Sequence, residues 1–295
     1  MAASLSERLG FRADERIAVV HCDDIGMCHA ANQGAFAALH HGPATCGSLM
    51  VPCPAFPEAA QIARATPGLD LGIHLTLNAE WEGYRWGPVA GAGAVPSLVE
   101  ADGSFLRTTR ETLERAQPEH VEIELRAQIE RALAAGIDVT HLDAHMGTAL
   151  LPPLGTVYAA LARDYRLPVF AVRPDEEALR AAGVPGAGGF FAALAALLEA
   201  AGVPVLDGFD ANSLGFAPGQ GEAHNRSRLR GLRPGVNYLI CHPAQGGAEL
   251  SAICPDAHAR DFERGFYGGE AGAHALADEG IRTVGMRALR NLMRA

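Results

Sequence analysis

An apolar run that ends in a cluster of polar residues is the pattern that most restricts the fold of this chain, because it recurs along the sequence. Its first instance is residues 17–20, typical of a buried strand, followed by His21, Asp23, Asp24 and Gly26. Two carboxylates beside a buried strand are costly to desolvate unless a cation lies nearby. A metal ion would supply that charge; alternatively, one acid caps the next helix and the other is solvated.

Strand-like and helix-like segments alternate without a visible domain linker. The expected strands are residues 17–20, 46–51, 71–77, 137–142, 168–172, 203–206, 236–241 and 281–284, and the expected helices are 30–41, 57–66, 121–133, 156–166, 190–201, 257–279 and a last one ending at Met293. Such alternation favours parallel strands with right-handed crossovers. About seven or eight such units favour a (β/α) barrel over an open sheet. We therefore expect one α/β domain over residues 1–295, without a GxGxxG or P-loop fingerprint.

Composition excludes several classes of protein. The net charge of −10 argues against a nucleic-acid binder, which needs a basic surface. The six cysteines include no CxxC pair, which argues against a disulfide scaffold or a zinc finger. No secretory signal and no apolar run of roughly 18 residues is visible, so no membrane span is expected. These features predict a cytoplasmic protein with reduced cysteines.

Residues 78–118 lack clear periodicity and hold several glycines and prolines. They contain Trp81, Tyr84 and Trp86, which include both tryptophans of the chain. A long segment of this kind is typical of a lid or binding loop. Alternatively, the tryptophans pack the loop onto the body of the domain.

Polar residues follow the expected strands at the ends where barrel enzymes carry their reactive groups. They are Asp23 and Asp24 after the first strand, His74 within the third, Asp143 and His145 after the fourth, Arg173 after the fifth and His242 after the seventh. One aspartate with two histidines suits Zn²⁺, Mn²⁺, Fe²⁺ or Co²⁺ and does not exclude Mg²⁺. Such an ion polarises a carbonyl and lowers the pKa of its bound water.

The other polar groups at this end fit acid–base chemistry. The second aspartate can act as general base, and His242 can protonate a leaving amine. Arg173 can orient the base or bind an oxyanion, or it forms a structural ion pair. If the fourth strand continues, His141, Asp143 and His145 share one face, and Asp143 can accept the second N–H of a metal-bound histidine. His141 is expected in the core or at the rim.

Nucleophilic catalysis by serine or cysteine is not indicated. No GxSxG elbow is present, and the acids beside Cys22 oppose a thiolate. The remaining histidines lack a comparable context and are expected to be structural or exposed, with His21 as the strongest exception. They are His29, His40, His41, His120, His224, His258 and His274.

Four motifs occur in a fixed order along about residues 16–290. They are His21-Cys-Asp-Asp-Ile-Gly-Met27 with Asn32 downstream, Gly72-Ile-His-Leu-Thr-Leu77, Thr140-His-Leu-Asp-Ala-His145 and Cys241-His-Pro-Ala244. With them the chain resembles the YdjC-like (ChbG/HpnK) carbohydrate deacetylases. This resemblance implies a distorted, TIM-like (β/α) barrel, a divalent ion such as Mg²⁺ or Zn²⁺, and hydrolysis of the acetamide of an amino sugar with release of acetate.

Carried over by position, the resemblance implies that one aspartate of the pair holds the metal with His74 and His145 and that the other is the base. We assign Asp24 to the metal. We assign Asp23 as the base, and His242 matches the family's late histidine, to which we assign the acid role. Residues 78–88 look like a subgroup insert whose aromatic side chains would stack on a sugar ring.

The chain also departs from the family pattern. The family's Asp-Ser-His-x-His reads here Asp143-Ala-His-Met-Gly147, so its second histidine is missing. A chitooligosaccharide substrate therefore does not follow from the resemblance.

We expect a metal-dependent deacetylase of a small N-acetylated sugar or glycoconjugate. Two alternatives are a sugar isomerase or lyase that uses the same metal, and a sugar-binding protein without catalysis. Both aspartates and both histidines argue against the binding protein, because such a module needs no base beside a metal. A homodimer is compatible with the sequence.

Overall fold

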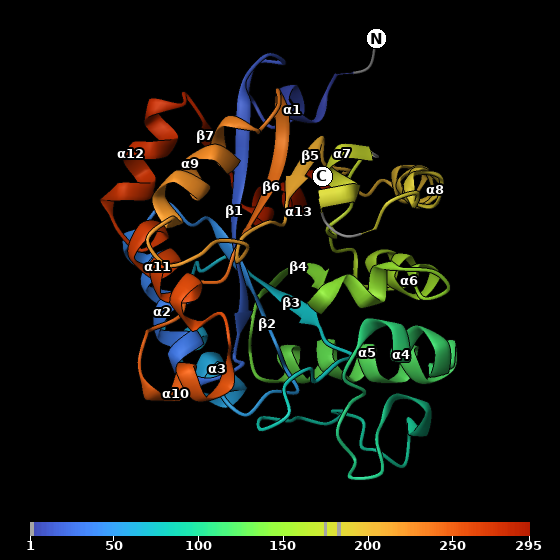
Figure 1. Cartoon of the computed structure of the whole chain (residues 1–295). Coiled ribbons are helices and arrows are strands. Elements are labelled where there is room, and N and C mark those ends of the chain that lie inside the picture. Colours follow the sequence, from blue (N-terminus) through green and yellow to red (C-terminus); the bar gives the residue numbers. More distant parts are fainter. Residues whose placement is uncertain (1–2, 174–175, 182–183) are drawn as a thin grey trace.

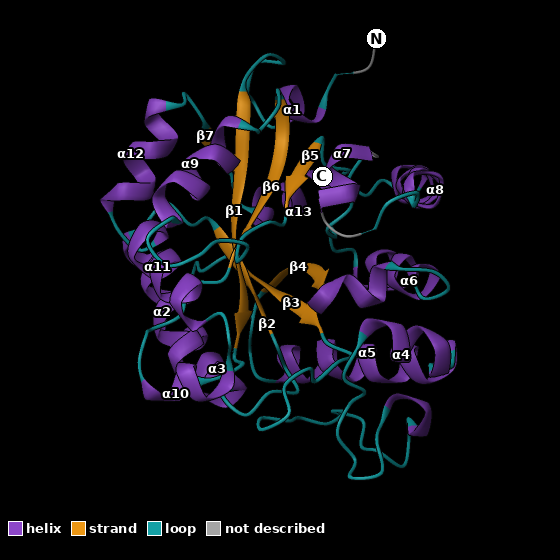
Figure 2. Cartoon of the chain, in the orientation of Figure 1, coloured by secondary structure: helices purple, strands orange, loops and turns teal. Residues whose placement is uncertain are grey.

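A parallel β-sheet forms the centre of the molecule, and helices flank it on both sides (Figures 1 and 2). The computed structural model describes residues 3–173, 176–181 and 184–295. Within these residues the strands are β1 Arg16–Ile25, β2 Cys46–Leu49, β3 Leu71–Leu75, β4 Val139–Ala144, β5 Gly208–Asp210, β6 Gly235–Cys241 and β7 Arg282–Thr283. Their order is β4-β3-β2-β1-β6-β5, with β7 beside β1, and all these pairs are parallel.

Helices fill the connections between these strands. They are α1 Leu5–Arg8, α2 His29–His41, α3 Phe56–Ala65, α4 Thr109–Arg115, α5 Pro118–Ala134, α6 Gly155–Tyr165, α7 Glu176–Ala181, α8 Gly188–Ala200, α9 Gly221–Arg230, α10 Ala248–Ile253, α11 Ala257–Tyr267, α12 Glu270–Asp278 and α13 Met286–Arg294, with 3₁₀ turns η1 Pro96–Leu98 and η2 His145–Leu150. Figure 1 shows α2, α3 and α9–α12 on one side of the strands and α4–α8 on the other. The longer helices match the sequence-based expectations, whereas α1, α4, α7, α9 and α10 were not predicted.

Two isolated bridges link the opposite edges of the sheet. Leu142 of β4 pairs with Val169, and Val172 pairs with Leu206 just before β5. The N–H of Leu206 donates to the carbonyl of Ala171 at 2.8 Å. The structure is therefore a parallel half-barrel whose open side is narrowed by these bridges, consistent with the expected distorted barrel.

Two predicted strands, at 168–172 and 203–206, are not continuous strands. Only single bridges form there, and the strand of this region begins at Gly208 instead. Each stretch is apolar because it is buried, but it lies against its neighbours for too few residues to form a ladder.

Residues 78–118 are more regular than the sequence suggested. They contain η1, α4 and an antiparallel bridge between Val99 and Phe105. Trp86 is only 4% exposed, and its indole N–H donates to the carbonyl of Asn78 at 2.8 Å. For Trp86 the packing alternative is therefore correct, because its ring is part of the hydrophobic core.

The remaining expectations about the chain concern membranes and cysteines. Within the described ranges, no helix combines the length and the apolar character that crossing a bilayer requires. All six cysteines are unpaired and buried. Burial raises the pKa of Cys28 to about 11 and that of Cys254 to about 12, which keeps both thiols protonated.

Helix α2 packs with its backbone against the segment that follows β6. A Cβ atom at Gly34 would lie 2.4 Å from the Cα of Ala244. The N–H of Gln245 donates to the carbonyl of Ala30 at 2.8 Å. This contact fixes the segment that begins with His242, and it requires a residue without a side chain at position 34.

We expect Gly34→Ala to lower the free energy of unfolding by about 1–3 kcal/mol, because the added methyl group meets backbone atoms that cannot move aside. Urea denaturation measures this change. Gly265→Ala in α11 is the matched control, since a Cβ there meets nothing within 4 Å. It should be neutral or stabilise by up to about 1 kcal/mol. Equal destabilisation by both variants would contradict the close-packing argument.

Candidate active site

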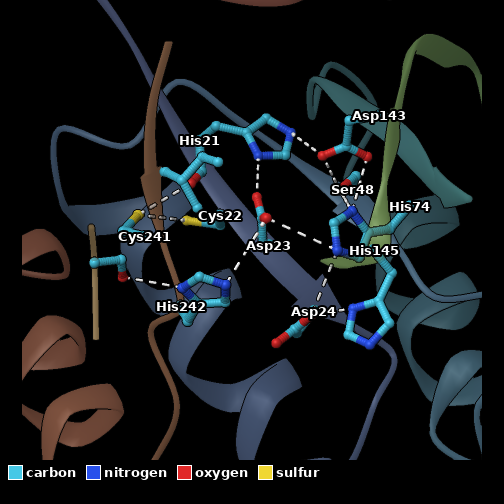
Figure 3. A network of polar contacts seen from close by, with 12 residues as sticks. His21, Cys22, Asp23, Asp24, Ser48, His74, Asp143, His145, Cys241 and His242 are labelled. Carbon is cyan, nitrogen blue, oxygen red and sulfur yellow. Dashed lines mark hydrogen bonds and ion pairs between the residues drawn. The ribbon is translucent and has the colours of Figure 1, made fainter. Parts of the chain in front are cut away.

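Both acids at the end of β1 face the same site because the strand is irregular there. In a regular strand, consecutive side chains point to opposite faces. The register between β1 and β2 shifts between Cys22 and Ile25, and Asp24 has φ of +63°. A bulge of this kind redirects a side chain, and it turns both carboxylates toward one cluster (Figure 3).

Asp24, His74 and His145 come together in that cluster, as the sequence predicted. Oδ1 of Asp24 lies 3.5 Å from Nε2 of His74 and 3.4 Å from Nδ1 of His145. All three residues are buried, and their potential ligand atoms lie within 4.8 Å of one another.

The donor set fits a metal ion. Among the described residues, Oδ1 of Asp24 is a buried oxygen without a hydrogen-bond partner, which costs free energy unless something binds it. Ligand atoms about 2.0–2.2 Å from a tetrahedral ion lie roughly 3.4 Å apart, similar to the two measured separations. One carboxylate and two imidazoles are a common donor set for a divalent transition metal.

A carboxylate lies behind each of the two imidazoles. Nδ1 of His74 donates to Oδ1 of Asp143 at 2.9 Å, and Nε2 of His145 donates to Oε2 of Glu80 at 3.0 Å. These contacts orient the opposite ring nitrogens toward Asp24. Asp143 thus occupies the position expected from the sequence, with His74 as its partner. Glu80 was not predicted, because it lies in the irregular segment 78–118.

The charges at the cluster are strongly coupled. Burial alone would raise the pKa of Asp24, but Arg260, His145 and His74 hold it well below its ordinary value. Burial would lower the pKa of His145, yet Glu80 and Asp24 raise it to about 9. Burial would lower the pKa of His74 as well, but Asp143 and Asp23 raise it well above its ordinary value. Without a metal, the acids therefore hold protons on both imidazoles.

Arg260 of α11 is a site residue that the sequence did not reveal. Its guanidinium donates to Oδ2 of Asp24 at 2.7 Å and to Oδ1 of Asp256 at 2.9 Å. It also lies 5.8 Å from the ring centre of Trp81. Arg260 fixes the second oxygen of Asp24, so that Oδ1 is the oxygen left to bind an ion.

Asp23 has different partners from its neighbour. Its Oδ1 lies 2.6 Å from Nδ1 of His21, and its Oδ2 lies 3.8 Å from Nε2 of both His74 and His242. His21 is fully buried, which agrees with its place as the exception among the remaining histidines. One oxygen of Asp23 is thus anchored, and the other faces the space between the two histidines (Figure 3).

Behind Asp23 a chain of hydrogen bonds crosses the interior of the sheet. Nε2 of His21 lies 2.8 Å from Nε2 of His141, and Nδ1 of His141 lies 2.9 Å from Oγ1 of Thr140. Thr140 donates in turn to Asp70, whose pKa is raised by burial. His141 is in the core, as expected, and burial lowers its pKa well below the ordinary value.

His242 is held by polar contacts on the side away from Asp23. Its Nδ1 donates to Oγ of Ser213 at 2.9 Å, and that hydroxyl donates to Oε2 of Glu263 at 2.7 Å. The backbone N–H of His242 donates to the same carboxylate oxygen at 2.6 Å. Burial lowers the pKa of His242, so its Nε2 carries a lone pair at neutral pH. Ser213 and Glu263 were not predicted.

The structure does not bring Arg173 to this cluster. Its side chain is 50% exposed and pairs with Glu199 at 2.8 Å and Asp207 at 3.5 Å. The structural ion pair, the alternative considered from the sequence, describes its contacts. The apolar stretch before Arg173 forms only isolated bridges rather than a strand. The side chain of Arg173 therefore lies beside α8, where it meets Glu199.

The three aromatic residues predicted to bind substrate differ in position. Trp86 is buried and packs edge-on to His145, with ring centres 6.3 Å apart, so the expectation that it stacks on a sugar needs correction. The hydroxyl of Tyr84 donates to the carbonyl of Met27 at 2.9 Å. Trp81 is partly exposed beside Arg260.

Comparison with known proteins adds independent information. The sequence profile of the YdjC-like protein family matches residues 18–284. A carbohydrate deacetylase from Thermus thermophilus is 37% identical over 259 residues, which cover 88% of each chain. A carbohydrate deacetylase from Brevibacillus brevis is 37% identical over 151 residues, or 51% of this chain and 57% of that one.

The fold also occurs in a solved structure. A crystal structure from Enterococcus faecalis V583, described provisionally as a cellobiose-phosphate cleavage protein, superposes with a TM-score of 0.77 at 24% sequence identity. The match covers 93% of this chain and 99% of that chain. At this level of identity the likeness supports the fold alone.

We expect Zn²⁺ binding to strengthen as the pH rises from about 6.5 to 9. Burial lowers the pKa of His145, but Glu80 and Asp24 raise it to about 9, so below this pH an ion must displace a proton. Affinity therefore falls as the pH falls. Competition titrations against a chelator measure it at each pH. An affinity that stays constant over this interval would contradict the assignment.

We expect Glu80→Gln to weaken Zn²⁺ binding about 10–100-fold, because the amide accepts the hydrogen bond of His145 without the negative charge. The same competition titration measures the change. Glu82→Gln is the matched control, since Glu82 lies on the same loop and is exposed. If the two variants bind Zn²⁺ equally well, Glu80 does not support the site.

Proposed function

Because this chain belongs to the YdjC-like family of carbohydrate deacetylases, we propose that it is a metal-dependent hydrolase that removes the N-acetyl group from an amino sugar. The products are acetate and the free amine. The observation that carries the proposal is the unpartnered buried oxygen of Asp24, which lies beside two imidazoles and directly next to Asp23. The relatives named carbohydrate deacetylase support the reaction class.

Asp24, His74 and His145 would hold the divalent ion. When bound, it polarises the carbonyl of the amide and lowers the pKa of a water molecule toward neutrality. Two imidazoles favour Zn²⁺ or a similar transition metal over Mg²⁺, which prefers oxygen ligands. Arg260 keeps the carboxylate of Asp24 ionised and in place.

Asp23 is the proposed general base. Its Oδ1 is bound by His21, so the carboxylate is oriented with Oδ2 toward the space beside Nε2 of His74. A water molecule activated there would give its proton to Oδ2 as its oxygen attacks the amide carbon. His21 acts as a positioning residue, because it binds the oxygen that does not take the proton.

His242 is the proposed general acid. Its Nε2 faces Oδ2 of Asp23 at 3.8 Å, while Nδ1 is fixed by Ser213. Because Nε2 of the neutral ring carries a lone pair, it would first take up the proton that Oδ2 of Asp23 accepts from the water and would then give it to the amine nitrogen as the C–N bond breaks. Ser213, which accepts from Nδ1, and Glu263 behind it would stabilise the positive charge that the ring carries between these two proton transfers. Trp81, partly exposed at the metal side, is the aromatic residue best placed to contact the sugar.

Acetate release from N-acetylglucosamine and its derivatives, with Zn²⁺, Co²⁺ or Mg²⁺ added, tests this function. We expect Asp23→Asn to lower kcat by about 10²–10⁴-fold, because the amide cannot accept the proton of the water. His74→Ala should lose both bound metal and activity. Arg173→Ala should keep the wild-type rate, since Arg173 lies apart from the cluster. Acetate release that survives in His74→Ala, or a rearranged sugar without acetate, would contradict the proposal.

A further inference from the structure

A largely apolar cavity of about 310 Å³ lies beside the two proposed proton-transfer residues. Its polar end contains Asp23, Asp143 and His242. The rest of its wall is dominated by apolar side chains, among them Met146, Leu150, Phe170, Phe191, Phe209 and Ile240. None of Asp24, His74 and His145 lines it. The cavity therefore borders Asp23 and Asp143 without being lined by the candidate metal ligands themselves.

The surroundings of the metal centre suit a sugar better than the cavity does. Near the candidate ligands lie the carboxylate of Glu80, the guanidinium of Arg260 and the partly exposed ring of Trp81. Sugar hydroxyl groups inside the cavity would lose their water and find few hydrogen-bond partners, which is costly. The sugar is thus expected on the metal side, and the cavity is left for another part of the substrate.

The acyl group is an apolar part of the substrate that the reaction brings close to the cavity. It is bonded directly to the carbonyl carbon, which must lie between the metal centre and Asp23 when water attacks. An acetyl group would contribute only one methyl to the cavity. A small group of the size of a water molecule fills about 30 Å³, so most of the cavity would stay unfilled.

The rim of the cavity is shaped by the part of the chain that departs from the family motif. Gly147 stands where the pattern has a second histidine, and it has φ of +68°. A Cβ there would meet nothing within 4 Å, so the cavity is open at this position. Met146 beside it is 46% exposed, and a flexible thioether adapts to ligands of different length.

We propose that this cavity binds the acyl group of the substrate and that the enzyme prefers amino sugars whose N-acyl chain is aliphatic and longer than acetyl. This inference rests on the proposed function. Hydrolysis then breaks the amide C–N bond: water supplies the hydroxyl group to the acyl carbon and a proton to the amine. The products are a fatty acid of matching length and the free amino sugar.

The first test compares glucosamine carrying N-acetyl, N-butyryl, N-hexanoyl and N-octanoyl groups, with release of the amine as the readout. We expect kcat/KM to rise with each added methylene, up to the length that fills the cavity, by no more than the ~10–200-fold that one methylene contributes in an apolar pocket. If the acetyl compound is hydrolysed and longer chains react more slowly, the inference is overturned while the proposed function stands.

The second test narrows the cavity. Ala211 lines it, and in Ala211→Phe the ratio of kcat/KM for hexanoyl over acetyl should fall at least tenfold. Ala271→Phe, on the exposed face of α12, is the matched control and should keep the wild-type ratio. Equal ratios in both variants would overturn the inference.

Binding to the metal-free protein separates the two proposals. Calorimetric titration should show tighter binding of N-hexanoylglucosamine than of N-acetylglucosamine, and Ala211→Phe should remove the difference. This result would support the acyl cavity even if no N-acyl sugar were hydrolysed, an outcome that would overturn the proposed function. A gain in affinity from an octyl group at C1 of N-acetylglucosamine, without a gain from the longer acyl group, would overturn the inference.

Discussion

The burial of two adjacent carboxylates at the end of β1 is the constraint on which the rest of the site depends. Desolvation favours the neutral form of Asp24, and the left-handed backbone at that residue adds strain of about 1–3 kcal/mol. Arg260 on one oxygen of Asp24 and the imidazoles near the other offset part of this cost. The surrounding segments, although distant in sequence, are placed to compensate these two charges.

Identical side chains at neighbouring positions acquire different chemistry from their partners. Asp24 is neutralised by a guanidinium and faces two imidazoles, an environment that keeps it ionised and suits a metal ligand. Asp23 is held at one oxygen by His21, while its other oxygen faces His74 and His242 and the residue borders a cavity. A proton acceptor needs this accessibility, and a ligand does not. The bulge in β1 makes the difference, because it lets two consecutive residues enter one site from separate directions.

The sequence predicted the parts of the site that depend on strand periodicity. His74 and Asp143 lie on paired strands, where parallel register brings them together, and His145 follows directly. Glu80, Arg260 and Ser213 could not be found this way, because a loop, a helix and an irregular segment carry them and only tertiary packing sets their positions.

The prediction that Arg173 belongs to the site rested on a strand that does not form. Arg173 follows an apolar stretch that forms a single bridge rather than a strand, and its side chain pairs with Glu199. The prediction of strands at 168–172 and 203–206 was wrong because a buried stretch is apolar whether or not it forms a ladder of hydrogen bonds with a neighbouring strand.

The family motif has a second histidine where this chain has Gly147, and the position of Gly147 beside the cavity suggests what this difference does. A histidine there would place a polar ring at the rim of the cavity, between its apolar wall and the polar end formed by Asp23 and His242. Glycine in its place removes a hydrogen-bonding group and leaves space, while Met146 adds an adaptable apolar side chain. The cavity therefore has a polar end formed by Asp23, Asp143 and His242, and an apolar wall that includes Phe209 and Ile240. Asp23 lies at the boundary, where a substrate with one polar and one apolar end would present the bond between them.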